Sequence, residues 1–460
     1  MEITWIGLIA IPLTFFLFFR YRLSTVLKLT IFFLPFGAVS VANFYNIPPF
    51  FGIGLDRYFA VILILSVILF SFNRVGLPNV LNKIKWLFFL SLLAIGISWI
   101  APLYFDKIMI WEYFTEPFSS FHEVPLTFTV TNVTKAAEFL ISGLFFTCVY
   151  KTLPLISPNK IARITILSLF IMNLSSFLDF FPEISRIWEV LKNNISYSNA
   201  QGVIYGYFEE PRLSGLAVEP SHLVIYSLKG LAIVCAFLKN NVTLFEKRVD
   251  FVLLTVFIIA SICTFSPTIL VGYTLIVGYL IYQRNTKKIL KVCLWIVIPC
   301  VIVFVVSNQL NTDLFGTLIK TAIGKLGISA EYGIHSEYRL ISVLAVWNAF
   351  LQSPAIGVGW GSVVHQVGFP LLLLGSVGIL GTSVFLYLIA SIFRLALKKI
   401  IYSSDISEKA LREGFILCFL ILTFMCFYTK AFLYFFNLSV IYVAAGMCSN
   451  YKISNRNEPT

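Results

Sequence analysis

The chain has 460 residues, of which 58% are hydrophobic and 12% charged, and it carries a formal net charge of +12. Soluble globular domains hold about twice that share of charged residues, so this composition excludes one. Apolar runs of about 17 to 25 residues, long enough to cross a bilayer, recur from end to end. The sequence therefore predicts an all-α, polytopic transmembrane helix bundle, since the strands of a β-barrel would be short and alternating.

In chain order we expect about thirteen membrane-spanning stretches, each about 20 residues long. The first is kept as a true span, because it lacks the basic start and small-residue cleavage site of a signal peptide. Together they are expected to form a single membrane domain over residues 1–460. The stretches cover residues 3–19, 25–42, 57–72, 86–104, 128–149, 161–180, 219–238, 250–264, 268–283, 289–307, 367–393, 413–428 and 431–448.

Most of the 34 lysines and arginines fall in one set of short loops. Positive residues mark the cytoplasmic side of a membrane protein, so we expect the N-terminus outside and the C-terminus in the cytoplasm. The net charge is then a topology signal, and we expect no nucleic-acid partner. The opposite side carries the long loops, with a first functional outer loop at 181–218 and a larger one at 308–366. All four histidines fall on this outer side: His122, His222, His335 and His365.

The eight cysteines all lie inside apolar runs, and no CxxC pair occurs. We interpret them as small packed residues and expect neither a disulfide nor a metal site. No Walker or GxGxxG motif is present, which argues against a nucleotide-driven machine. No internal repeat is visible, which weakens an inverted-repeat transporter.

The stretch from Tyr205 to Lys229 begins as a polar loop and ends as an apolar helix. Proline suits the first helical turn, so we expect a helix to begin near Pro220. Residues three or four apart share one face of a helix. That face carries a polar stripe, which must face protein or water rather than lipid. The stripe consists of Glu219, His222, Tyr226 and Lys229.

Arg212 precedes this helix and can hold a phosphate or carboxylate through its fork of donors. Glu219 is interpreted either as a general base or as a plain N-cap carboxylate. Lys229, inside an apolar helix, is either functional or part of a salt bridge within the bundle. Lys135 and Glu138 are one helical turn apart and are expected to pair with each other.

A second polar region lies in the large outer loop, where His335 and Arg339 precede the segment LISVLAVWNAFLQS. We expect an amphipathic helix lying on the membrane, with Trp347 on its apolar side. Arg339 then faces the same vestibule as Arg212, or else is an interfacial anchor. The glycine-rich turn at 354–361 and His365 follow; the glycines allow close approach to a ligand or a neighbouring helix.

Four segments together resemble the O-antigen polymerase (Wzy-type) family, which shares a superfamily with the O-antigen ligases. They are RLSGLAVEPS at 212–221, the Arg339–Trp347 helix with PAIGVGWGS at 354–362 and His365, FFLPFGAVSVANF at 32–44, and TFSPT at 264–268. The chain departs from the family pattern in the second region. Glu337-Tyr338 replaces the usual Ser-Gly before Arg339, and Gln366 stands where relatives often have Asn.

The resemblance implies a glycosyltransferase of the bacterial inner membrane that acts on polyprenyl diphosphate-linked oligosaccharide. Such an enzyme transfers the growing glycan from its lipid carrier onto the next lipid-linked unit, without a cofactor. The resemblance implies catalytic roles for Arg212, Glu219, Arg339 and His365. We expect substrate contacts from the side chains of His222, Tyr226, Lys229, His335 and Tyr205. A chain-length regulator protein is a further expected partner, and the product is O-antigen, capsule or another polysaccharide.

Two alternatives remain from the sequence. A ligase of the same superfamily would move finished glycan onto a lipid A core. A transporter or flippase of lipid-linked sugars would need polar residues lining both halves of the bundle, whereas here they cluster toward the outer side.

Overall fold

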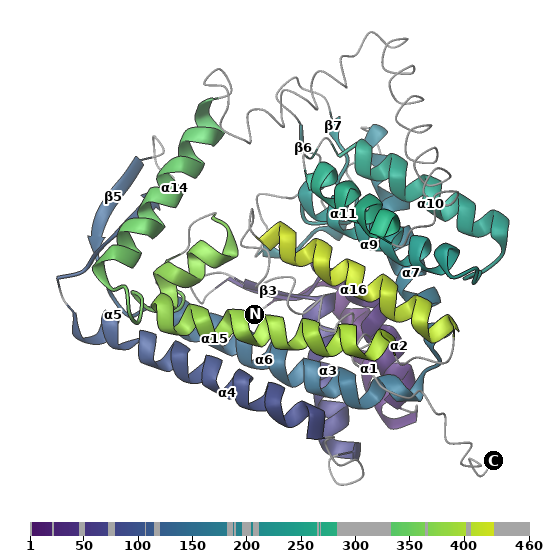
Figure 1. The fold of residues 1–460 in the computed structure, drawn as a ribbon, viewed down its shortest axis with the longest axis horizontal. Coiled ribbons are helices and arrows are strands. Elements are labelled where there is room, and N and C mark those ends of the chain that lie inside the picture. Colours follow the sequence, from purple (N-terminus) through teal and green to yellow (C-terminus); the bar gives the residue numbers. More distant parts are fainter. Residues whose placement is uncertain are drawn as a thin grey trace.

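The computed structural model describes residues 2–20, 23–45, 51–71, 79–105, 107–114, 120–181, 187, 190–195, 204–205, 211–264, 266, 268–282, 333–363, 367–401 and 406–426. Most of these residues are helical (Figure 1). Within this part, five helical stretches are long and apolar enough to cross a membrane, which agrees with a helical membrane protein. They are Ile84–Tyr104, Val130–Leu155, Pro158–Phe180, Pro220–Lys239 and Phe369–Arg394.

The helices of the described part follow one another along the chain with short connections. Their bounds are α1 Trp5–Arg20, α2 Leu23–Phe33, α3 Leu55–Ser71, α4 Asn79–Ser98, α5 Ile100–Tyr104, α6 Val130–Thr152, η1 Leu153–Leu155, α7 Pro158–Ser176, η2 Phe177–Phe180, α9 Pro220–Lys239, α10 Lys247–Ile262, α11 Thr268–Tyr282, α14 Gly333–Gln352, α15 Phe369–Ile401 and α16 Ile406–Cys426. The predicted spans 289–307 and 431–448 lie outside the described residues.

Short antiparallel strands accompany the helices, and the purely helical prediction missed them. One sheet has the order β1-β2-β3, and two further strand pairs are β4-β5 and β6-β7. The bounds are β1 Glu2–Ile3, β2 Ser40–Phe44, β3 Phe51–Gly54, β4 Met109–Phe114, β5 Ser120–Pro125, β6 Ile204–Tyr205 and β7 Pro211–Arg212.

The predicted span 25–42 is wrong in its second half. Helix α2 ends at Phe33, and the chain turns before it enters β2. Pro35 has no backbone N–H to continue the helix. The apolar residues that follow are buried because β2 lies between β1 and β3, so their hydrophobicity reflects a packed sheet rather than a membrane span.

Helix α9 is the central helix of its half of the bundle, and α7, α10, α11 and α16 pack against it. Its side chains from Leu223 to Phe237 are all buried. Glycines allow the close approach: a Cβ at Gly414 of α16 would lie 3.0 Å from the Cα of Ile233. The polar stripe predicted on this helix therefore faces protein along most of its length.

A buried carboxylate joins three helices at the end of α9. Glu413 Oε2 accepts hydrogen bonds from Lys239 Nζ (2.8 Å), Asn240 Nδ2 (2.7 Å) and the Tyr279 hydroxyl (2.7 Å). Low dielectric strengthens such a network and makes an unpaired member costly. The network stabilises the packing of α16 and α11 on α9.

Replacing Glu413 by Ala should lower the free energy of unfolding by about 3 kcal/mol, because the Lys239 ammonium group would lose its buried partner. The measurement is denaturant unfolding in mixed micelles. Glu246→Ala is the matched control, since Glu246 is exposed and makes no side-chain cap bond at the start of α10. Equal stability of the two variants would contradict this role for Glu413.

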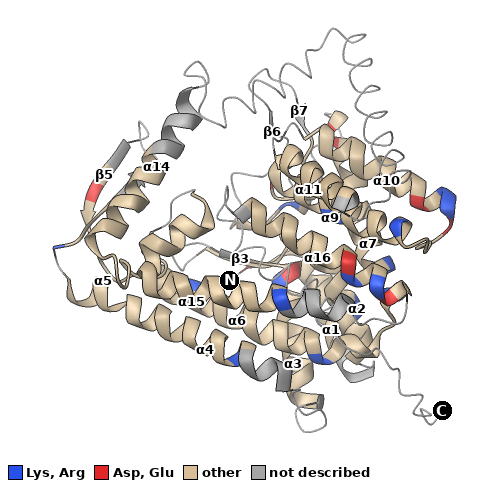
Figure 2. Cartoon of the chain, in the orientation of Figure 1, with Lys and Arg blue, Asp and Glu red and all other residues tan. Residues whose placement is uncertain are grey.

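We call one end of the bundle the loop face: it is the end where α6, α9 and α15 begin and α4, α7 and α10 end (Figure 1). Figure 2 shows basic residues gathered around the starts of α10 and α16, at the opposite end. The charge asymmetry predicted between the two sets of loops thus separates in space along the bundle.

Candidate functional site

The segment between Arg212 and α9 is held by a hydrogen bond at each successive backbone N–H. We call residues 213–217 the anchored loop. Its N–H groups bond, in chain order, to Cys263 O (3.3 Å), Asp179 Oδ2 (2.7 and 2.9 Å), Ser175 Oγ (3.0 Å) and Ser214 O (2.9 Å). The loop thereby joins the ends of α7 and α10 to the start of α9.

Gly215 is required by this geometry. Its φ is +50°, a conformation that costs little only for glycine. A Cβ there would also lie 2.5 Å from the backbone nitrogen of Ser176. The glycine of the RLSG segment is thus explained by packing against the end of α7.

A buried lysine and aspartate support the anchored loop. The Lys192 amine donates a hydrogen bond to Ser214 Oγ at 2.9 Å, and the side chains of Lys192 and Asp179 belong to residues only 2% exposed. Burial lowers the pKa of Lys192 to about 8, although the Asp179 carboxylate partly offsets this effect. Sequence reasoning missed both residues. The available signal was Asp179 itself, an acidic residue among apolar ones that requires a partner.

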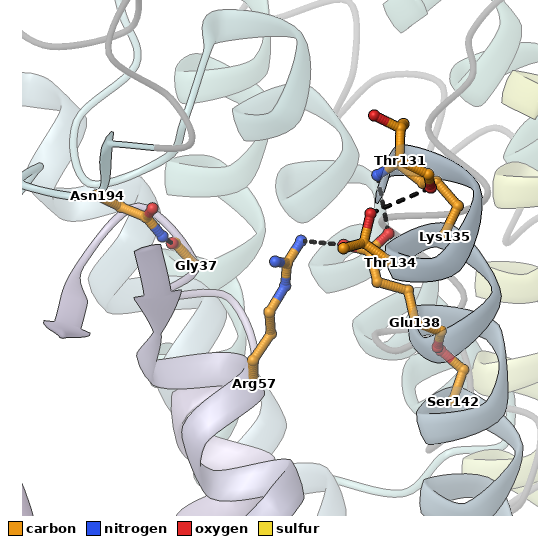
Figure 3. A network of polar contacts seen from close by, with 8 residues as sticks. All are labelled: Gly37, Arg57, Thr131, Thr134, Lys135, Glu138, Ser142 and Asn194. Carbon is orange, nitrogen blue, oxygen red and sulfur yellow. Dashed lines mark hydrogen bonds and ion pairs between the residues drawn. The ribbon is translucent and has the colours of Figure 1, made fainter. Parts of the chain in front are cut away.

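The residues after Lys192 bind the sheet near the N-terminus. Asn193 Oδ1 accepts from Ser40 N (2.8 Å), and Asn193 O accepts from Asn43 Nδ2 (2.8 Å). Asn194 Nδ2 donates to Gly37 O at 2.7 Å, as Figure 3 shows. We call residues 192–194 the strap, because it connects the β1-β2-β3 sheet to the anchored loop.

The polar stripe on α9 changes from exposed to buried along the helix. The helix begins at Pro220, as predicted, and Glu219 is its exposed N-cap residue. The Glu219 carboxylate makes no capping bond and instead accepts from Ser221 Oγ at 3.0 Å, so it is not explained by capping.

The three following members of the stripe lie deeper. His222 is half-buried, whereas Tyr226 and Lys229 are buried in the bundle. The Lys229 amine lies 5.6 Å from the ring centroid of Tyr226, a cation–π contact. Glu219 and His222 are therefore the members placed nearest to a ligand on the loop face.

For several predicted residues the structure gives the backbone position. Strands β6 and β7 pair with Ile204 opposite Arg212 and Tyr205 opposite Pro211, so the predicted Tyr205 and Arg212 lie on neighbouring strands. His335 and Arg339 lie in the first turns of α14. The side chains of Tyr205, Arg212, His335 and Arg339 lie outside the described part, as does the whole of His365.

A helix forms over the segment predicted to be amphipathic. Helix α14 buries Ala345, Val346 and Ala349, and packs against α15. It exposes an apolar side that includes Leu344 and Trp347. Figure 1 shows α14 lying across the loop face rather than along the long helices. The arrangement places the helix that carries Arg339 on the same face as the anchored loop.

The glycine-rich turn at 354–361 packs into a kink of α15. Val358 N donates to Gly375 O (2.8 Å) and Gly359 N to Ser376 O (3.0 Å), where Gly378 has a φ of +64°. Trp360 is buried and stacks on Phe385. Of the two predicted uses of these glycines, close approach to a neighbouring helix is the one that these contacts explain.

A charged group links α3 to α6 near the strap. Lys135 pairs with Glu138 at 2.9 Å, as predicted, and Arg57 Nη2 contacts the other carboxylate oxygen at 3.2 Å. Figure 3 shows Arg57 reaching from α3 to Glu138 on α6. Because one carboxylate neutralises two cations, the group keeps a net positive charge.

Within the part that the structure describes, the anchored loop, the strap and the start of α9 thus form one candidate site on the loop face, with α14 lying across the same face. Comparison with models of known protein families and with curated proteins gives no match to this chain.

Proposed function

We propose that the chain is a polysaccharide polymerase, which transfers a growing glycan from a polyprenyl diphosphate carrier onto the next lipid-linked repeat unit. The observation that carries the proposal is the anchored loop, whose backbone is fixed between Arg212 and the exposed Glu219. A fixed backbone beside a cation and a carboxylate supports group transfer, since catalysis depends on preorganised charges.

The transfer needs few components. The oxygen of an acceptor hydroxyl attacks the anomeric carbon, the bond from that carbon to the diphosphate breaks, and the polyprenyl diphosphate leaves. Arg212 and Arg339 would stabilise the charge on the leaving diphosphate. Glu219 would accept the hydroxyl proton, with His365 as the other candidate for this role. The leaving group is already activated, so no nucleotide is required.

The surroundings of the site support a lipid-linked substrate. Large apolar side chains are exposed on α14 and along α4, as expected for helices that contact acyl chains. A polyprenyl chain would lie in the bilayer beside them while its diphosphate reaches the loop face. With basic residues at the opposite end of the bundle, the loop face would be the outer face of the bacterial plasma membrane.

A deletion strain tests this function against its alternatives. Without a polymerase, cells should carry only single repeat units, and the wild-type chain should restore long glycan. Accumulation of long, carrier-linked polymer in the deletion strain would instead indicate the ligase. Loss of lipid-linked units from the outer leaflet, with polymerisation intact, would indicate a flippase.

A further inference from the structure

Lys192 lies outside the described helices and strands, and it is nevertheless among the most buried charged residues. Its amine donates to Ser214 Oγ at 2.9 Å, two residues after Arg212. A buried amine is costly unless it is hydrogen-bonded and near an opposite charge. Here both conditions are met by groups that belong to, or directly hold, the anchored loop.

Asp179 connects the lysine to the backbone of the same loop. One of its carboxylate oxygens accepts from the N–H groups of Ser214 and Gly215, and its charge raises the pKa of the lysine against the effect of burial. Lys192 and Asp179 therefore hold Ser214 from two sides, through its side chain and its backbone. The segment that follows Arg212 is fixed by this arrangement.

The strap also fixes Lys192 itself. Asn193 and Asn194, its neighbours in the chain, bond to Ser40, Asn43 and Gly37 near the sheet. The lysine is thus held on a rigid base, and its position is transmitted to the anchored loop rather than absorbed by the strap.

We propose that Lys192 is a positioning residue for glycan transfer, whose buried ammonium group holds the anchored loop so that Arg212 stays aligned with the diphosphate. The proposal rests on the polymerase function above. It adds a residue that does not touch the substrate and acts through Ser214 and Asp179. Misplacing a catalytic group slightly is enough to slow a reaction by orders of magnitude.

The proposal predicts a pH dependence with a definite sign. The pKa of Lys192 is about 8 in the folded protein and 10.5 for an ordinary lysine. Above pH 8 the amine loses its charge, and transfer should slow. Stability does not fall with it: between these two values the folded state binds fewer protons than the unfolded state, so this group favours folding increasingly as pH rises. Among the described residues, the charged group facing Lys192 is Asp179.

The test compares wild type with Lys192→Met from pH 6.5 to 9.5, using a synthetic polyprenyl diphosphate-linked repeat unit. We expect kcat/KM to fall about tenfold in the variant, and the decline above pH 8 to be present only in wild type. Lys135→Met is the matched control: it removes a lysine paired with Glu138 and should keep the wild-type profile. Wild-type kcat/KM in Lys192→Met, or an unchanged decline above pH 8, would overturn the proposal.

A second measurement separates this proposal from the proposed function. Hydrogen exchange of the amides of residues 213–217, compared at one pH below 8, reports the anchored loop without any reaction. Faster exchange in Lys192→Met supports the positioning role even if wild type forms no polymer, in which case the polymerase function fails alone. Unchanged exchange in the variant would refute the role of Lys192 in either case.

Discussion

Replacing Arg212 by Ala is expected to leave the protein folded in the membrane and to reduce glycan polymerisation by about 100-fold, the usual effect of removing one donor that stabilises charge in a transition state. The anchored loop begins after Arg212, and its bonds to Asp179, Ser175 and Cys263 do not involve the arginine side chain. The backbone should therefore remain in place. The measurement is the length distribution of glycan made in a deletion strain that carries the variant.

Three further variants sharpen this prediction. Arg212→Lys should recover only part of the activity, because lysine offers a point charge in place of a bidentate fork. Glu219→Ala and Arg339→Ala should also leave single repeat units on the carrier. Lys247→Ala is the control, since Lys247 is an exposed basic residue at the opposite end of the bundle. Long chains of normal length from all three alanine variants would refute the proposed site.

Replacing Asp179 by Ala should give the largest loss of stability among the loop-face substitutions. Two buried N–H groups, of Ser214 and Gly215, would lose their acceptor, at about 1–3 kcal/mol each. The Lys192 amine would also lose the nearby negative charge that offsets its burial. The variant should unfold at lower denaturant concentration in mixed micelles and should make no long glycan.

Asp179→Asn provides the graded comparison, because its amide oxygen can still accept from both N–H groups while the charge is removed. It should be more stable than Asp179→Ala. A double-mutant cycle with Lys192→Met should show coupling, since the two residues act on the same loop. If Asp179→Ala is as stable as wild type, then the hydrogen bonds of Asp179 do not hold the loop.

The features that the sequence predicted correctly depend on local patterns. Pro220 marks the start of α9 because a fixed φ suits the first helical turn. Lys135 and Glu138 pair because residues three apart on a helix are neighbours. The helix over the segment after Arg339 follows from apolar periodicity, and it brought α14 to the loop face as expected from its place in a long outer loop.

The features that the sequence missed depend on contacts between distant residues. Asp179 reaches Ser214 across 35 positions, and Asn193 reaches Ser40 across 153. A single sequence contains no information on such pairings, so the strap and the buried Lys192 could not be foreseen. The second half of the span 25–42 failed for a related reason. Hydrophobicity alone does not distinguish a strand between two others from a membrane helix.

The most direct test of the central claim is to incubate the purified protein in detergent or liposomes with a synthetic polyprenyl diphosphate-linked repeat unit and separate the products by size. We predict a ladder of glycans that grow by one repeat unit at a time, with one polyprenyl diphosphate released for each new linkage. Unchanged substrate in the presence of folded protein would contradict the account, as would transfer of glycan only to an added lipid A core.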